Sequence, residues 1–379
     1  MVVAITGASG FVGRVVVPLL VGQGRRVRAL MRAGGALRSD GALQAGGALL
    51  SGEVARSAGA GRFGGAAPSG TARMAGVEIV TGDLLRRESL AELVRGADVV
   101  IHLAAAITVG DTFDAAAYHV NMEGTRLLLE AARAAGVRRF IQVSSVVVFE
   151  QAPYDQVLNE DRSLALGSVY DYERSKLTAH TMALSFNAPD FEVVVLAPTA
   201  VVGPYDWRPS RIGEMVMNLY RRRIPAIFAG GIDFVDVRDI AAALVASVDR
   251  GRPGQVYLLS GGWHSLTELR DVVAAAAVGP VAAAAAAVAA GKGGRVGRSL
   301  LPLVLPLWLV RVAVPLVKVF SAVTGRFRYF NYAAINKLVD SNRRVDPSKA
   351  RAELDFTSRP FAETIGDTVE WFRQEGYLT

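Results

Sequence analysis

The chain contains 379 residues, of which 51% are hydrophobic and none is cysteine, and its formal net charge is +7. This length is sufficient for a large buried core and two lobes, and the lack of cysteine excludes a disulfide framework and a thiolate nucleophile. The four histidines, at positions 102, 119, 180 and 264, do not show the spacing of metal ligands, so no metal is expected. The positive charge is distributed over many arginines, and its densest run, 221–223, is typical of a solvated helix end, so nucleic acid is not expected as a partner.

Apolar runs of strand length alternate with runs of helical pattern along the chain, which predicts parallel strands joined by helical crossovers. We predict strands near Val2–Thr6, Arg26–Met31, Glu78–Val80, Asp98–Leu103, Arg139–Val143, Glu192–Leu196 and Gln255–Leu259. We predict helices near Phe11–Gly22, Ser89–Arg95, Ala115–Ala135, Asp171–Ser185, Ser210–Arg222, Arg238–Asp249 and Ser265–Ala276. The expected fold class is therefore α/β, a doubly wound parallel sheet of the Rossmann type with ligand across the carboxyl ends of its strands.

A glycine-rich turn, T-G-A-S-G-F-V-G at 6–13, joins the first predicted strand to the first predicted helix. Such a turn presents backbone N–H groups and the positive end of a helix to a pyrophosphate, so we expect a bound dinucleotide. Gly7 allows the tight turn, Gly10 the close approach of phosphate, and Gly13 the packing of helix on strand. Taken alone, the motif also fits an ordinary strand-to-helix turn.

Three groups suited to proton transfer follow in the middle of the chain. Tyr172 and Lys176 are four residues apart in a predicted helix, which places phenol and ammonium on one face, where the ammonium favours the phenolate. Ser144 and Ser145 end the predicted strand at 139–143, at the sheet edge where ligands bind. We expect a serine there to donate to a carbonyl oxygen that Tyr172 protonates.

In these segments the chain resembles the extended or atypical branch of the short-chain dehydrogenase/reductase superfamily. That branch includes nucleotide-sugar epimerases, dihydroflavonol reductases and 3β-hydroxysteroid dehydrogenases. The motifs that carry the resemblance are T-G-A-S-G-F-V-G at 6–13, G-D-L at 82–84, H-L-A-A at 102–105, N-M-E-G-T at 121–125, V-S-S at 143–145, Y-E-R-S-K at 172–176 and F-V-D-V-R-D at 234–239. The resemblance implies a dinucleotide-binding domain over 1–200, to which 234–260 return, a smaller and mostly helical substrate lobe formed by 201–233 and 261–379, and a homodimer.

The cofactor is expected to be NADP(H), with NAD(H) as the alternative. Arg32 stands at the end of the second predicted strand, where an acidic residue would bind the adenosine ribose of NAD. A guanidinium at this position suits the 2′-phosphate of NADP. Arg32 is equally well interpreted as an ordinary surface arginine. Asp83 and Leu84 resemble the family pair that contacts adenine, although an Asp here also fits a turn or cap. Asn121 resembles the family residue that braces the active site, and it equally fits a buried side chain that is hydrogen-bonded for packing. His102 is interpreted as a hydrogen-bonded residue at the end of a strand, without a catalytic role. The residues expected at the cofactor are Gly7, Ser9, Gly10, Phe11, Val12, Gly13, Arg32, Asp83, Leu84, Ala104, Ala105, Asn121, Tyr172, Lys176, Pro198 and Val201.

Three segments lie outside this pattern. Residues 33–76 are rich in Gly, Ala and Ser and are expected to form a mostly disordered insertion, and 274–290 are nearly all Ala and Val. Residues 300–323 are apolar but interrupted by prolines and cations, which favours buried helices lining an apolar pocket over contact with a membrane surface. The basic flanks that the membrane alternative would use are Arg295, Arg298, Arg326 and Arg328. No signal-peptide pattern precedes the first predicted strand, so a cytoplasmic location is expected.

The expected activity is reversible hydride transfer between nicotinamide and a carbinol or ketone carbon of a small molecule. Tyr172 is the expected acid and base, Lys176 holds the ribose and lowers the phenol pKa, and Ser145, in preference to Ser144, orients the substrate oxygen. Epimerases of the family usually carry Arg in an R-D-F segment, whereas this chain reads G-G-I-D-F at 230–234, which favours an apolar substrate. The alternatives are a nucleotide-sugar epimerase or dehydratase and a non-catalytic dinucleotide sensor.

Overall fold

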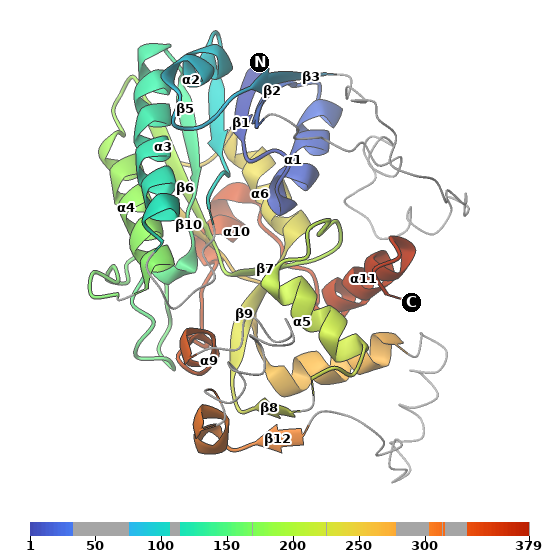
Figure 1. Ribbon diagram of the computed structural model, residues 1–379. Helices are drawn as coiled ribbons and strands as arrows, with labels where there is room; N and C mark the ends of the chain where they lie inside the picture. The colour runs from blue at the N-terminus through green and yellow to red at the C-terminus, as the bar shows by residue number, and fades with distance from the viewer. Residues whose placement is uncertain are drawn as a thin grey trace.

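The computed structural model describes residues 1–32, 76–106, 114–168, 170–224, 226–277, 303–312, 314 and 332–378. Seven parallel strands form its main sheet, in the order β10-β6-β5-β4-β1-β2-β3 (Figure 1). The bounds of these strands are β1 (Val2–Thr6), β2 (Arg26–Met31), β3 (Val77–Thr81), β4 (Val99–His102), β5 (Arg139–Val143), β6 (Glu192–Pro198) and β10 (Val256–Leu259). The predicted α/β fold with a Rossmann-type parallel sheet is confirmed.

Helices cover both faces of the main sheet. In Figure 1, α2 (Arg87–Val94), α3 (Ala115–Ala134) and α4 (Asp171–Ser185) lie along one side of the sheet, and α1 (Phe11–Gly22) and α6 (Val237–Ser247) lie along the other. This two-sided cover explains why the strands read as continuous apolar runs in the sequence, since both of their faces are buried.

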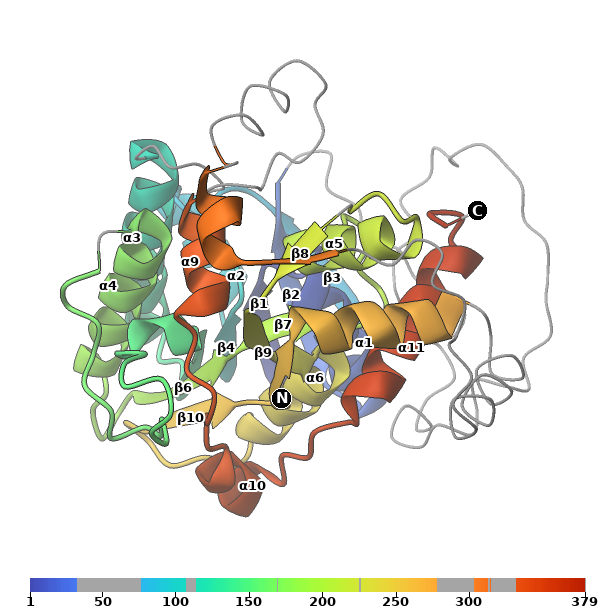
Figure 2. The same ribbon diagram turned by 90° about the horizontal axis from the view of Figure 1, so that it is seen from below.

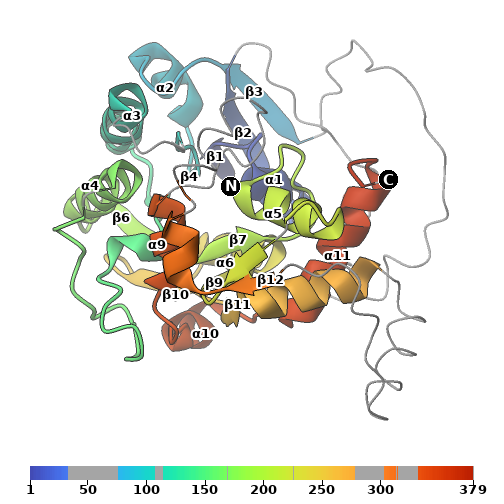
Figure 3. The same cartoon turned by 60° about the horizontal axis from the view of Figure 1, so that its bottom comes forward.

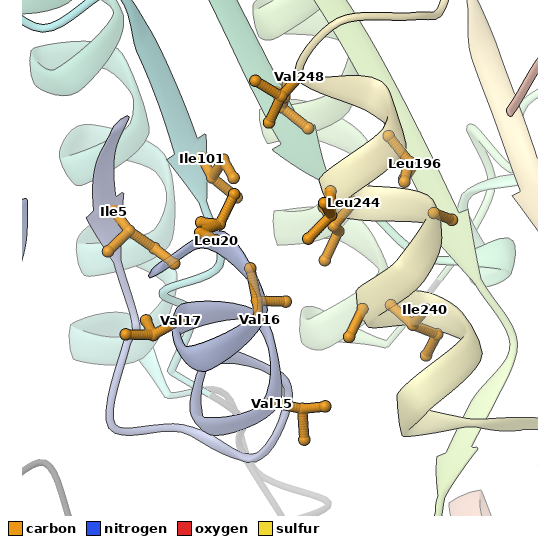
Figure 4. Close-up of a cluster of buried hydrophobic side chains, with 14 of the residues drawn as sticks. Ile5, Val15, Val16, Val17, Leu20, Ile101, Leu196, Ile240, Leu244 and Val248 are labelled. Carbon is orange, nitrogen blue, oxygen red and sulfur yellow. The ribbon is translucent and has the colours of Figure 1, made fainter. Parts of the chain in front are cut away.

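The alternation of side chains along each strand divides the core into two layers. Ile5 and Ile101 pack with Val16 and Leu20 of α1 and with α6 on one face (Figure 4), whereas Val100 packs with α2 and α3 on the other. Each fully buried aliphatic side chain of this kind contributes about 1.5–3 kcal/mol. The rigid sheet that results fixes the loops at its edge.

The strand order reverses between β1 and β4, which lie side by side in the centre of the sheet. Thr6 pairs with His102, so the chain leaves both strands at the same height. β5 is the next neighbour of β4, and it ends at Val143. The glycine-rich turn, the loop after β4 and the serines after β5 therefore meet at one edge, where open α/β sheets bind their ligands.

The rest of the chain forms a smaller mixed region. It contains a three-stranded sheet in the order β11-β9-β7 and a two-stranded sheet of β12 and β8 (Figure 2). The strands are β7 (Ala200–Val202), β8 (Ala226–Phe228), β9 (Gly231–Asp236), β11 (Trp263–Ser265) and β12 (Leu303–Leu305). Its helices are α5 (Arg211–Tyr220), residues 266–277, residues 307–312, α9 (Tyr332–Val339) and α11 (Phe361–Gln374), whereas α10 (Ser348–Leu354) packs against α6 and β10 of the main sheet. The sequence predicted this region as mostly helical. Four of its strands escaped prediction because three residues show no periodicity, and the six-residue β9 escaped because it begins at a glycine and carries Asp233 and Asp236 among its apolar residues.

Several expectations fall wholly or partly outside the described residues: those for 33–75, 278–302 and 315–331. Of the apolar segment at 300–323, the described part is mainly exposed, with Leu303 69%, Trp308 66% and Val312 66% accessible. Val310 and Val314 are buried, so only one side of this part faces the protein. The expectation of buried helices is wrong for the exposed residues, and contact with a membrane surface remains the untested alternative. Within the described ranges, no helix has the length and apolar character needed to cross a membrane.

Candidate active site

The glycine-rich turn has the close packing that a cradle for phosphate requires. Gly7 adopts φ +75°, and a Cβ there would lie 2.7 Å from the backbone nitrogen of Ala104. A Cβ at Gly13 would overlap the carbonyl oxygen of Gly7, and the Gly10 N–H donates to that same oxygen at 2.9 Å. Among the described residues, no side chain caps the N-terminus of α1 and no acidic residue lies in its first turn. Uncapped N–H groups at a helix N-terminus fit a pyrophosphate, so the turn fits the dinucleotide that the sequence predicts.

Other residues expected at the cofactor lie within the turn itself, directly after β2, at the end of β6 or in β7. Phe11, Val12 and Val201 pack against the same core cluster, and Pro198 ends β6. Ser9 and Gly10 are exposed, as is Arg32, which follows β2 directly. Their contact with a cofactor stays a prediction.

Asp83 and Leu84, which follow β3, make contacts that stabilise the fold. The Asp83 carboxylate accepts the N–H of Leu85 at 2.9 Å, which is the turn that the sequence offered as an alternative. Leu84 lies against Gly124 of α3, where a Cβ would be only 3.0 Å from the Leu84 Cβ. Adenine contact by either residue stays a prediction.

Ser145, Tyr172 and Lys176 lie together at the end of β5. Ser145 precedes the 3₁₀ turn Val146–Val148, and its hydroxyl lies close enough to the phenol of Tyr172 to lower the pKa of that phenol. Lys176, one turn further along α4, is buried and donates from Nζ to the carbonyl oxygen of Val143 at 3.2 Å. Ser144 instead is buried against His180, with 2.9 Å between its Oγ and the imidazole Nδ1. Of the two hydroxyls, that of Ser145 lies near the phenol and that of Ser144 is bound to His180, and the catalytic role of Ser145 stays a prediction.

Burial controls the protonation of the phenol and the ammonium. Burial raises the pKa of Tyr172 above its usual 10, while the hydrogen bond from Ser145 and the charge of Arg211 lower it. Burial also lowers the pKa of Lys176 to about 8. The sequence predicted that Lys176 lowers the phenol pKa, and this prediction is wrong: the pKa of Tyr172 is raised overall by burial, and the cation that partly offsets this rise is Arg211 of α5. The reason is that Lys176 directs its ammonium to the backbone of β5.

A second cation reaches Tyr172 from the smaller region. Lys337 of α9 lies with Nζ 5.2 Å from the ring centroid of Tyr170 and 5.6 Å from that of Tyr172. It also pairs with Glu173, at 3.1 Å between Nζ and Oε1. Figure 3 shows α9 next to α4. Sequence reasoning missed Lys337 and Arg211, because no motif marks either residue and both come from elements remote in sequence.

Asn121 of α3 connects the loop after β4 to α4. Its Oδ1 accepts the N–H of Ala106 at 2.7 Å, and its Nδ2 donates to the carbonyl oxygen of Ala106 at 2.9 Å. The same Nδ2 donates to Ser175 Oγ at 3.3 Å. Of the two interpretations left open for Asn121, this geometry combines both: the amide is a buried packing device that also braces the helix carrying Tyr172.

Comparison with known proteins decides the family. The model of the NAD dependent epimerase/dehydratase family matches residues 3–260. The chain belongs to this family. The predicted enzyme class, the extended short-chain dehydrogenase/reductases, is confirmed. The cofactor typical of this family is an NAD(P) dinucleotide.

Its relatives include proteins of matching length. Sterol demethylase protein B of Methylococcus capsulatus is 27% identical over 100% of both chains. A putative dihydroflavonol 4-reductase of Synechocystis is 26% identical, covering 99% of this chain and 95% of the relative. Among solved structures, that of gox2253 superposes with a TM-score of 0.72 at 24% identity, over 100% of this chain and 99% of the other. The structural likeness supports the fold, and the substrate is left to the site itself.

Proposed function

We propose that this family member is an NAD(P)-dependent oxidoreductase that transfers a hydride between nicotinamide and a carbinol or ketone carbon of an apolar substrate. The observation that carries the proposal is the placement of the Ser145 hydroxyl beside the Tyr172 phenol at the carboxyl end of β5, with Lys176 one helical turn further along α4 and bound to the carbonyl oxygen of Val143. This is the set of groups that an alcohol or ketone oxygen requires: a hydrogen-bond donor, a transferable proton and a cation.

In the direction of reduction, Tyr172 gives its phenolic proton to the carbonyl oxygen while Ser145 donates a hydrogen bond to that oxygen. A raised phenol pKa keeps this proton in place at neutral pH. The phenolate that remains is stabilised by Ser145 and by the charge of Arg211. The nicotinamide, when bound, supplies the hydride in reduction and accepts it in oxidation. Oxidation requires the phenolate as base, so it is favoured by higher pH.

The cofactor would be held by the turn at 6–13 and by Lys176, whose buried ammonium is suited to ribose hydroxyls. We assign NADP(H) as the preferred form, because the exposed guanidinium of Arg32 follows β2 where the adenosine ribose lies in this fold. Arg32→Asp should reverse the preference toward NAD(H), measured as the ratio of the two dissociation constants. Unchanged binding of both forms would contradict this assignment.

The apolar substrate is supported by two observations. Ile232, which stands immediately before Asp233 and Phe234, packs into the core of the smaller region, so no guanidinium is offered there to a substrate diphosphate. The relatives of matching length are named for a sterol and for dihydroflavonol, both polycyclic molecules. A nucleotide-sugar epimerase or dehydratase is the second candidate, since the family includes both.

One experiment separates the candidates. The protein is incubated with NADPH or NADH and with a set of polycyclic ketones or sugar nucleotides, and absorbance at the nicotinamide band is followed. Stoichiometric oxidation of the cofactor with a ketone supports the proposal. Conversion of a sugar nucleotide without net change in cofactor would replace it with the second candidate. Tight cofactor binding without any turnover would favour a dinucleotide sensor.

A further inference from the structure

A row of buried polar side chains lies beneath the candidate active site. Thr6 of β1, His102 of β4, Asn121 and Thr125 of α3 and Ser175 of α4 are each no more than 7% exposed. A buried polar group is costly unless it is hydrogen-bonded, so the partners of these five side chains are strongly determined. Four different elements meet in this row, and none of the roles assigned above requires His102.

The proton positions around His102 follow from the geometry of Thr125. A threonine hydroxyl has one hydrogen, and Thr125 donates it to the backbone carbonyl of Asn121 at 2.6 Å. Its oxygen, 3.0 Å from His102 Nε2, must therefore accept there, and Nε2 carries a hydrogen. His102 Nδ1 therefore carries no hydrogen and accepts the hydrogen bond that the Thr6 hydroxyl donates, at 2.6 Å. The oxygen of the same hydroxyl accepts the N–H of Ala104 at 3.3 Å.

The imidazole must be neutral for this arrangement. Burial and the charge of Lys176 lower the pKa of His102 to about 3, so a neutral ring is retained throughout the physiological range. A histidine carries its acceptor and its donor on opposite sides of a rigid ring. Asn and Gln carry both at one end, so neither spans the distance from Thr6 to Thr125 in the same way.

The row continues from Asn121 to the backbone of Tyr172. Ala106 fixes the orientation of the Asn121 amide by accepting from Nδ2 and donating to Oδ1. The second hydrogen of Nδ2 points to Ser175 Oγ at 3.3 Å, and Ser175 donates to the carbonyl oxygen of Tyr172 at 2.9 Å. Apart from the bond that Asn121 donates back to Ala106, the donors in the row follow one direction, from Thr6 of β1 to Ser175 of α4.

We propose that His102, as its Nε2–H tautomer, is a positioning residue that fixes the position of Tyr172 relative to the glycine-rich turn. One end of the row holds Thr6, directly before Gly7, and the other holds the carbonyl of Tyr172. The inference rests on the proposed function, because it gives His102 a role through the acid–base residue. His102 itself does not touch the substrate or the reacting atoms.

The kinetic test uses variants that cut the row at one bond. His102→Asn keeps an acceptor for Thr6 but loses the reach to Thr125, and Thr125→Val removes the hydroxyl at nearly constant shape. Each should lower kcat roughly 10- to 100-fold, the scale of a misplacement of about 1 Å, with KM and cofactor affinity within about twofold. Thr125→Ser keeps the hydroxyl and should restore kcat. The double variant H102N/T125V should be no slower than the slower single variant, since both cut one row.

Unchanged kcat in H102N and T125V, or multiplication of their effects in the double variant, would overturn the proposal. A second measurement does not depend on turnover. In the wild-type protein with ¹⁵N-labelled histidine, the His102 signals, identified by their loss in H102N, should show protonated Nε2 and bare Nδ1 from pH 5 to 8. A protonated Nδ1 would overturn this proposal alone, whereas a wild type without turnover on any substrate would count against the proposed function.

Discussion

Replacing Tyr172 with Phe removes the proposed proton donor while keeping the ring beneath Lys337. The wild-type phenol stays protonated at neutral pH because burial raises its pKa, so the variant loses a group that is in the reactive form. General acid catalysis contributes about 10²- to 10⁴-fold, or about 2.7–5.4 kcal/mol of transition-state stabilisation. The folded state loses the interaction of the phenol with the nearby Ser145 hydroxyl, which is worth about 1 kcal/mol. The variant should therefore fold and bind cofactor nearly as well as the wild type, with kcat reduced at least 10²-fold.

The assay is single-turnover oxidation of NADPH with a saturating ketone, together with cofactor titration by fluorescence. The matched control is Tyr170→Phe, which loses the same hydroxyl from a ring that also lies under Lys337. This control should retain wild-type kcat. Full activity of Tyr172→Phe, or an equal loss in both variants, would refute the assignment of Tyr172 as acid and base.

Three further outcomes are expected. Lys337→Gln removes a cation near the Tyr172 ring, so the acidic group that limits oxidation at low pH should titrate at higher pH; a pH–rate profile identical to that of wild type would contradict this. The pKa of Lys176 is about 8 in the folded state and 10.5 in the unfolded state. Below pH 8 this difference lowers the free energy of unfolding by up to roughly 3 kcal/mol, and the loss disappears as the pH rises from 8 to 10.5. The stability of wild type relative to Lys176→Met should therefore increase between pH 7 and 10 in urea unfolding, and parallel pH dependences would show that the ammonium is not desolvated. Gly13→Ala should abolish cofactor binding because its Cβ overlaps the Gly7 carbonyl, whereas Gly22→Ala, with no atom within 4 Å of the added Cβ, should bind normally and gain up to about 1 kcal/mol in stability.

The sequence by itself predicted the elements of the main sheet because their signals are local. The predicted bounds of β1, α1 and α4 agree with the observed ones, since an apolar run, a glycine turn and a helical period are each complete within a short stretch. The candidate residues Ser145, Tyr172 and Lys176 could be named from the chain for the same reason. Their meeting at one edge followed from the rule that parallel strands end together.

Only the tertiary structure determined which residues from remote parts of the chain contact the site. Arg211 and Lys337 belong to elements remote in sequence from α4, and only the packing of α5 and α9 beside it sets their charges against Tyr172. The protonation of His102 likewise depends on Thr6 and Thr125, which pack around it from another strand and a helix. Local sequence patterns show which chemical groups the chain carries. The charges and hydrogen bonds around each group come from residues that are distant in sequence, and such contacts produce no periodic pattern in the sequence.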